Sequence, residues 1–264
     1  MYNFAYHRPS SLAEAASAIS GASDGKLLAG GMTLIPTMKQ RLAEPSDLVD
    51  LGAIRDLAGI SASGDGLKIG AMTTHAAVAA SADVKAAIPA LASLADGIGD
   101  PQVRNRGTIG GSIANNDPAA DYPGAVLALN ATVHTNKRTI AADAFFTGMF
   151  ETALEDGEII TAVTFPKPAK AAYVKFPNPA SRYALVGVFV AQTGGGVRVA
   201  VTGAAPCAYR ASELEAALAG SFSAAALDGV TIDAGGLNGD IHATPEYRAH
   251  LIKVLAKRAV AAAG

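Results

Sequence analysis

The order of apolar and polar residues divides the first 52 positions into two helices and two strands. Ser11 and Glu14 form a capping box, which predicts a helix running to about Ile19. A short apolar run ends at Gly30-Gly31, as a strand entering a turn does. The elements after that first helix are a strand at 26–29, a helix at 33–42 and a strand at 47–51. The pattern therefore predicts a small α/β unit.

A second α/β unit is predicted to follow the first. Its strands are expected at 67–71, 131–135, 138–140 and 158–165, and its helices at 74–80, 83–97 and 121–130. A polar turn at 100–107 leads into a second glycine pair, within Thr108-Ile109-Gly110-Gly111-Ser112. Two successive units with one kind of loop suggest a single ligand held between them.

The chain changes character after Pro166-Lys167-Pro168. Strands rich in Val, Phe and Tyr are predicted at 172–176, 183–192 and 197–203, the last two joined by a hairpin turn at 193–196. Helices at 212–219 and 245–263 close the chain. We therefore expect an α+β protein with one domain at 1–168, in subdomains of about 1–53 and 54–168, and a second at 169–264.

Composition excludes several functions. The net charge of −2 without a basic cluster argues against a nucleic-acid partner. Cys207 is the only cysteine, so this chain cannot form a disulfide within itself or hold an all-cysteine iron–sulfur cluster. The five histidines lack the spacing of metal ligands, and no run of about 18 apolar residues predicts a membrane span. The expected location is the cytoplasm.

The two glycine pairs are the candidate chemistry. Glycine allows the positive φ angles that let successive amides point at one diphosphate, and it has no Cβ to block close approach. Thr33, Thr108 and Ser112 add hydroxyl groups, and the helix expected near Thr33 adds a positive dipole end. Either pair alone is more often a simple tight turn. The chain has no P-loop and no GxGxxG motif, which disfavours a Rossmann site.

Residues 29–39 and, more closely, residues 102–121 resemble the two FAD loops of the FAD-binding subunits of molybdenum hydroxylases. This group includes xanthine dehydrogenase and aerobic carbon monoxide dehydrogenase. The resemblance extends over the whole chain. It implies an FAD-binding domain of the vanillyl-alcohol oxidase (PCMH) type, followed by an α+β domain like the C-terminal domain of the carbon monoxide dehydrogenase flavoprotein.

The resemblance also implies which residues contact the cofactor. Two loops wrap the diphosphate, and they comprise Ala29, Gly30, Gly31, Met32, Thr33, Leu34, Ile35 and Pro36 with Thr108, Ile109, Gly110, Gly111 and Ser112. The other expected contacts are Ile98, Asn115, Asp117, Asp121, Ile160 and Lys175. No catalytic or metal-binding residue is expected.

Simpler roles stay open for several of these residues. Asp117 or Asp121 could be only a helix N-cap, and Lys175 only a solvated strand residue. Ile98 and Ile160 are expected to be buried whether or not they touch the cofactor. Arg104 is expected in a solvated turn. Tyr183 could stack on the flavin ring, but packing within the C-terminal domain is the preferred interpretation.

The implied activity is electron transfer in an oxidoreductase complex. A molybdopterin large subunit oxidises the substrate, a small subunit relays electrons through [2Fe-2S] clusters, and FAD on this chain passes them to a small-molecule acceptor. The complex is expected to be a heterotrimer or its dimer. Its substrate stays open among carbon monoxide, a purine, nicotine and other heteroaromatics. The alternatives are a stand-alone flavin oxidoreductase of the same fold and an assembly subunit without catalytic function.

Overall fold

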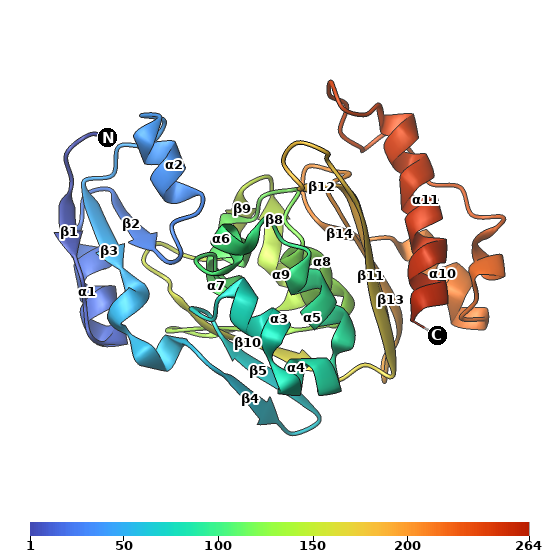
Figure 1. Ribbon diagram of the computed structural model, residues 1–264, viewed down its shortest axis with the longest axis horizontal. Coiled ribbons are helices and arrows are strands. Elements are labelled where there is room, and N and C mark those ends of the chain that lie inside the picture. The colour runs from blue at the N-terminus through green and yellow to red at the C-terminus, as the bar shows by residue number, and fades with distance from the viewer. Residues whose placement is uncertain (264) are drawn as a thin grey trace.

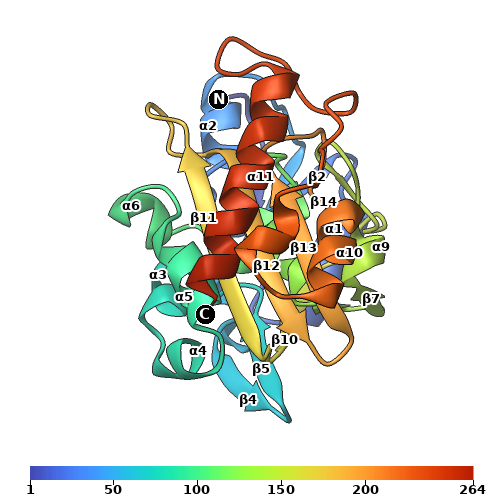
Figure 2. The ribbon, with the colours of Figure 1, turned by 90° about the vertical axis from the view of Figure 1, so that its right-hand side faces the viewer.

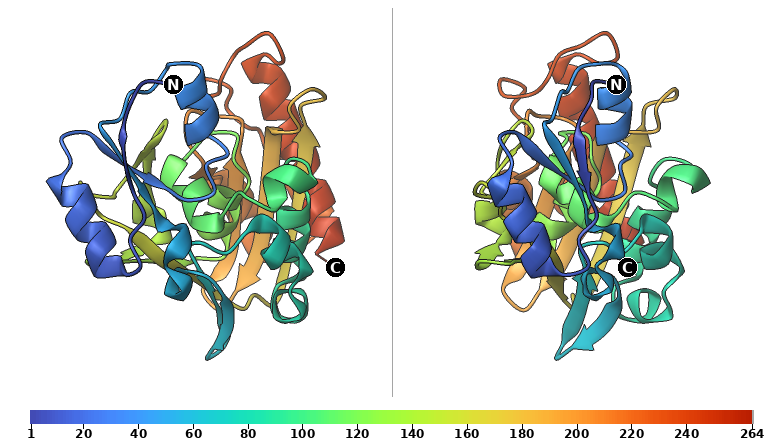
Figure 3. Two further views of the ribbon diagram at one scale, coloured as in Figure 1. Left: turned by 60° about the vertical axis from the view of Figure 1, so that its left-hand side comes forward. Right: turned by 90° about the vertical axis from the view of Figure 1, so that its left-hand side faces the viewer.

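The computed structural model describes residues 1–263, which form a mixed α/β protein in three parts arranged side by side (Figure 1). The N-terminal part is a three-stranded parallel sheet in the order β1-β3-β2. Its strands are β1 (Ala5–His7), β2 (Gly25–Leu28) and β3 (Asp47–Asp50). Its helices are α1 (Leu12–Gly21) and α2 (Leu34–Lys39), and two 3-10 turns, η1 (Leu51–Ala53) and η2 (Arg55–Leu57), leave it. Figure 3 shows this part from two further sides.

The middle part is built on a five-stranded antiparallel sheet in the order β4-β5-β10-β6-β7. Its strands are β4 (Ile60–Ser63), β5 (Gly66–Gly70), β6 (Thr132–Thr135), β7 (Thr139–Ala141) and β10 (Ile160–Pro166). The first helices are α3 (His75–Ala80), α4 (Ala82–Ala87), α5 (Pro89–Asp96) and α6 (Pro101–Arg104). The others are α7 (Ile109–Asn115), α8 (Tyr122–Ala128) and α9 (Ala142–Phe145), followed by the hairpin of β8 (Phe146–Gly148) and β9 (Glu151–Thr152).

The C-terminal part is a four-stranded antiparallel sheet in the order β11-β12-β13-β14. Its strands are β11 (Lys170–Pro177), β12 (Ala184–Thr193), β13 (Gly196–Thr202) and β14 (Tyr209–Arg210). The helical elements are α10 (Ser212–Gly220), the 3-10 turn η3 (Ala224–Leu227) and α11 (Pro245–Ala262). Figure 2 shows α10 and α11 lying across one face of this sheet.

Strand β12 is buried on both faces, and the alternation of its side chains decides which core each one joins. Phe189 and Ala191 pack into the core of the middle part, which includes α5 and α8. Val188 and Val190 pack on the opposite side, against α10 and α11. The C-terminal sheet therefore separates two hydrophobic cores. A third, smaller core lies in the N-terminal part around Val49.

The predicted elements are largely confirmed, with informative exceptions. The single helix expected at 83–97 is two helices, because Pro89 has no amide to continue α4 and instead starts α5. The segment 108–112, expected to be a turn, is the N-cap and first turn of α7. The polar turn at 100–107 contains α6, which Asp100 caps. Strands β1 and β4 were not predicted.

The predicted boundary falls where the chain passes between sheets. Strand β10 ends at Pro166 and β11 begins at Lys170. The division into 1–168 and 169–264 stays a prediction. Within residues 1–263, no helix combines the length and apolar character needed to cross a membrane.

Candidate functional site

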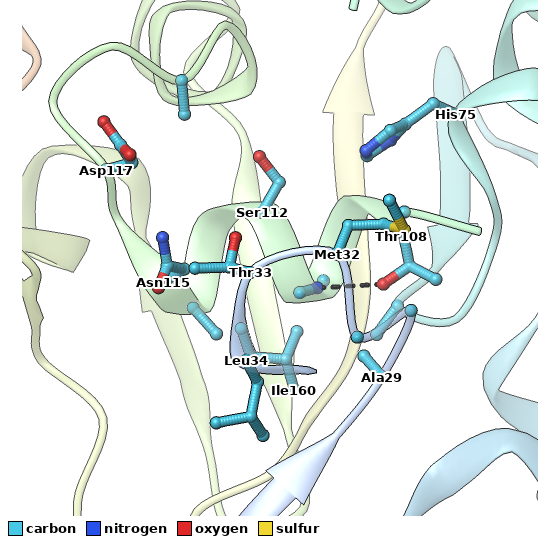
Figure 4. Close-up of a pocket in the computed structure, with 18 of the residues that line it drawn as sticks. Ala29, Met32, Thr33, Leu34, His75, Thr108, Ser112, Asn115, Asp117 and Ile160 are labelled. Atoms are coloured by element: carbon cyan, nitrogen blue, oxygen red, sulfur yellow. Dashed lines mark hydrogen bonds between the residues drawn. The ribbon is translucent and has the colours of Figure 1, made fainter. Parts of the chain in front are cut away.

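A cavity of ≈ 590 Å³ lies where the N-terminal and middle parts meet. Segments far apart in the sequence surround it, and Figure 4 shows residues of the β2–α2 loop facing α7 and β10 across it. Its volume is within the usual range for a small-molecule or cofactor site. All but four of the residues predicted to contact the cofactor line this cavity. The four that do not are Ile35, Pro36, Ile109 and Lys175.

The β2–α2 loop, residues 29–33, supplies free amide groups to this cavity. Gly31 has φ +75°, which favours glycine. Gly30 lies against the second glycine segment, since a Cβ there would be 2.0 Å from the carbonyl oxygen of Arg106. Among residues 1–263, the amides from Gly30 to Thr33 donate to no other protein group. Four consecutive unpaired amides beside a cavity fit an anionic ligand with several oxygens.

The second glycine segment differs from the prediction, because its amides are already used. The amides of Ile109, Gly110 and Ser112 donate to Thr73, Ala71 and Thr108 carbonyls, and that of Gly111 donates to Thr108 Oγ1 at 3.1 Å. Neither glycine has positive φ. Gly110 instead allows the start of α7 to lie close to Ala71, the residue after β5, since a Cβ there would be 2.6 Å from Ala71 Cβ. This segment therefore shapes the cavity rather than offering a row of free amides.

Side-chain groups on both segments remain available to a ligand. Within the described chain, Thr33, Ser112 and Asn115 make no side-chain hydrogen bond to another protein group, and Figure 4 shows them close together beside the cavity. Thr108 is not available in the same way, because its hydroxyl caps α7. Asp117 Oδ1 accepts from the Ala119 amide at 2.9 Å, which is a local turn contact rather than a helix N-cap and leaves its second oxygen free of protein partners.

Asp121 joins the cavity to the C-terminal sheet. It is only 5% exposed, and its carboxylate pairs with Lys175 at 3.1 Å and accepts from the Tyr173 hydroxyl. Burial raises the pKa of Asp121, and the Lys175 ammonium and the Tyr173 hydroxyl oppose that rise. Its side chain makes no capping hydrogen bond to α8. Lys175 is not solvated: it is 11% exposed and also donates to the Gly97 carbonyl at 2.9 Å.

Several apolar residues line the cavity as predicted, and two other expectations need correction. Ile98 and Ile160 both border it, and Ile160 is also part of the middle core. Arg104 is not in a solvated turn, because its guanidinium donates to the Ile98 and Gly99 carbonyls at 3.0 and 3.1 Å. Tyr183 does not pack inside the C-terminal domain. It is 47% exposed at the tip of the β11–β12 hairpin and lines the cavity.

Two cavity residues carry chemistry that the sequence analysis did not single out. His75 is the buried first residue of α3, and Glu158 precedes β10. Hydrogen bonds from Arg138 above all, and from the Glu155 amide and Thr135 hydroxyl, hold the pKa of Glu158 at about 2 against its burial. Neither belongs to a glycine motif, so only the fold brings them to the cavity. Within the described residues, no cluster of three or more His, Cys, Asp or Glu side chains could hold a metal ion.

Comparison with known proteins assigns this chain to a family. Residues 2–168 match the family model described as the FAD binding domain in molybdopterin dehydrogenase. Residues 171–263 match the CO dehydrogenase flavoprotein C-terminal domain. The chain belongs to the FAD-binding subunits of the molybdenum hydroxylases. FAD is therefore the cofactor of this FAD-binding subunit, and the subunit is part of an oxidoreductase.

Relatives share nearly the full length of the FAD-binding subunit. It is 36% identical to the nicotine 6-hydroxylase medium subunit of Paenarthrobacter nicotinovorans, over 98% of this chain and 96% of the relative. It is also 36% identical to the carbon monoxide dehydrogenase medium chain of Afipia carboxidovorans, with the same coverage.

Solved structures give the same result. The crystal structure of the cyanide-inactivated Cu,Mo-CO dehydrogenase contains a chain with a TM-score of 0.92 and 36% identity, covering 100% of this chain and 98% of that one. Quinoline 2-oxidoreductase from Pseudomonas putida 86 contains a chain with a TM-score of 0.89 and 30% identity, covering 99% and 96%. The fold is thus that of the carbon monoxide dehydrogenase flavoprotein in both its domains.

Proposed function

We propose that this subunit takes electrons from [2Fe-2S] clusters of a small partner subunit and passes them, through its FAD, to an external small-molecule acceptor. A large molybdopterin subunit oxidises the substrate in the same complex. The observation that carries the proposal is the cavity itself, whose lining includes both the unpaired amides of Gly30 to Thr33 and the exposed Tyr183. Its relatives are named as medium subunits of nicotine 6-hydroxylase and carbon monoxide dehydrogenase, which supports a place in such a complex.

The residues of this chain fit the tasks of binding and shielding the cofactor. The free amides from Gly30 to Thr33 bind the diphosphate, and Ser112 and Asn115 add polar contacts. Ile98 and Ile160 exclude water from the apolar part of the cavity. When bound, FAD supplies the exchange of one or two electrons at a time.

The division of labour within the complex follows from the side chains that this subunit has. A [2Fe-2S] cluster needs four protein ligands, usually thiolates, and Cys207 is the only cysteine. Cys207 lies beside the Asn116 side-chain amide at 3.5 Å and does not line the cavity. The clusters therefore belong to another subunit, and the complex is a heterotrimer or its dimer. The cytoplasmic location stays a prediction from the sequence.

Purification of the tagged chain from its native cells tests this proposal. We expect two further proteins in equal amount, the flavin absorbance of FAD, and an electron paramagnetic resonance signal from [2Fe-2S] clusters after reduction. The substrate should reduce the flavin in the complex and leave the isolated subunit oxidised. Flavin reduction by substrate in the isolated subunit would support a stand-alone oxidoreductase instead. A colourless subunit that gains no flavin on incubation with FAD would support a role in assembly only.

A further inference from the structure

His75 lines the cavity, and no hydrogen bond within the described protein explains why a histidine stands there. It begins α3, directly after the Thr74 cap, and it is only 5% exposed. Figure 4 shows its ring directed into the cavity, near Met32 and Thr108. The ring also touches Gly107 closely, since a Cβ at that glycine would be 2.5 Å from Nε2 of His75. His75 therefore lies beside both segments that surround the candidate diphosphate position.

The imidazole has no protein partner for its polar atoms. Nδ1 is fully buried without a hydrogen bond, so a ligand in the cavity cannot reach it. Nε2 also makes no hydrogen bond within the described chain, but it is not among the fully buried atoms and is the nitrogen that a ligand can reach. The ring of Tyr122 packs against it, with 5.3 Å between ring centroids, and Tyr122 is fully buried. This packing fixes the orientation of the imidazole in advance, as is typical of groups that position a ligand.

The electrostatic surroundings keep this ring uncharged. Burial, and secondly the charge of Arg104, lower the pKa of His75 to about 4. At neutral pH one ring nitrogen therefore carries a proton that it can donate, and the other can accept. A buried polar group without a partner lowers the stability of a protein. Nε2 borders the cavity without a protein partner, which suggests that a bound ligand supplies one.

We propose that His75 donates a hydrogen bond from its neutral imidazole to bound FAD, and so is a binding residue for the cofactor. The proposal rests on the FAD-binding role of this subunit. An apolar side chain of similar size would fill the same space without leaving a polar atom unpaired. His75 therefore stabilises the FAD-bound protein and lowers the stability of the apoprotein.

Four variants of the complete chain test the proposal. His75→Leu and His75→Phe remove both nitrogens, and the Phe variant keeps an aromatic ring against Tyr122. His75→Gln keeps a donor at a similar reach. His134→Leu is the matched control, because His134 is partly buried in β6, contacts Thr164 Oγ1 at 2.8 Å and does not line the cavity. Each apoprotein is titrated with FAD by flavin fluorescence, and its thermal unfolding is followed without FAD.

We expect the two apolar variants to bind FAD roughly 10-fold more weakly. Their apoproteins should be as stable as the wild type or more stable, because a buried unpaired group is gone. The Gln variant should recover most of the affinity, and His134→Leu should bind normally. Wild-type affinity in either folded apolar variant would overturn the proposal, as would equal losses in the Gln variant. A wild-type chain that binds no FAD would instead overturn the FAD-binding role itself.

Discussion

At the scale of single residues, the two glycine pairs have different roles, although their similar sequences predicted the same one. The sequence motif predicted two equivalent loops with free amides, but only the first has them. Gly31 alone among the four has positive φ, whereas Gly30 and Gly110 are needed for close backbone packing. A motif identifies glycines that tolerate no Cβ. It does not say whether the space is occupied by a ligand or by another part of the chain.

Gly30 therefore gives a prediction about loop packing. Gly30→Ala places a Cβ 2.0 Å from the Arg106 carbonyl oxygen, so the β2–α2 loop must move away from the segment that precedes α7. We expect a folded protein that purifies without flavin absorbance. Gly21→Ala is the control, since nothing lies within 4 Å of a Cβ at that position. If Gly30→Ala retains FAD as the wild type does, the contact between the two segments does not shape the binding site.

Glu158 gives a prediction about pH. Its folded pKa of about 2 lies below the ordinary value of 4.5, so its contribution to stability is present above about pH 4.5 and is lost as the pH falls toward 2. This lowering of the pKa corresponds to about 3 kcal/mol of folding stability. Solvent screens little of it, because Glu158 is only 3% exposed. Urea unfolding of Glu158→Gln should show a loss of about 2–3 kcal/mol at pH 7 and a shrinking loss below pH 4.5.

The neighbouring Glu155 is a matched control for that experiment. It contacts Lys137 and Arg138 at 3.4 and 3.5 Å, but its side chain is 59% exposed. Exposed ion pairs contribute about 0–1 kcal/mol, so Glu155→Gln should change stability little at any pH. Equal effects of the two variants would mean that burial of the Arg138–Glu158 pair is unimportant.

At the scale of elements, periodicity predicted the long elements and only some of the short ones. Helix α11 and the β12–β13 hairpin have 18, 10 and 7 residues, enough for several repeats of a pattern, and both were predicted. Strands β1 and β4 have only 3 and 4 residues, too few for a repeat of the pattern to stand out from the surrounding loops. The start of α7 was missed because its glycines are poor helix formers, although Thr108 is a good N-cap.

Asn116 connects the end of α7 to the β8–β9 hairpin, and this gives a prediction about stability. It ends α7 with φ 43°, and its fully buried side-chain amide donates to the Gly148 and Glu151 carbonyls at 2.9 and 2.7 Å. We expect Asn116→Ala to lower the free energy of unfolding by about 3 kcal/mol, from lost hydrogen bonds and a strained backbone. Asn116→Gly should lose about 1 kcal/mol less, because glycine accepts positive φ. Urea unfolding measures both, and an Ala variant as stable as the Gly variant would contradict the backbone argument.

At the scale of the whole molecule, the contact between the cavity and the C-terminal sheet was the least predictable feature. The motif around Asp121 and the match at Lys175 placed both residues near the cofactor, but nothing in the sequence paired them with each other. They are 54 positions apart, and the fold joins them because β11 packs beside α5 while α8, which Asp121 precedes, packs against β12 and β13. Gly187 on β12 leaves room for the Tyr173 hydroxyl, which donates to Asp121. A Cβ at position 187 would lie 2.3 Å from that hydroxyl.

Removal of the Lys175 charge should show what this connection contributes. Lys175→Met leaves Asp121 buried without its cation, which we expect to lower the stability of the apoprotein by about 3–5 kcal/mol at pH 7. Burial then raises the folded pKa of Asp121 without opposition from Lys175. A group with a raised folded pKa loses its contribution as the pH rises, so the defect should be smaller at pH 5 than at pH 8.

The double variant Asp121→Asn, Lys175→Met separates the ion pair from the packing around it. Replacing both charged groups removes the unpaired carboxylate, so most of the lost stability should return even though neither native residue remains. FAD affinity is then the second measurement. If Asp121 contacts the cofactor as the family resemblance implies, the double variant should be stable and still bind FAD weakly. If Asp121 serves only to join the C-terminal sheet to the cavity wall, stability and FAD affinity should return together.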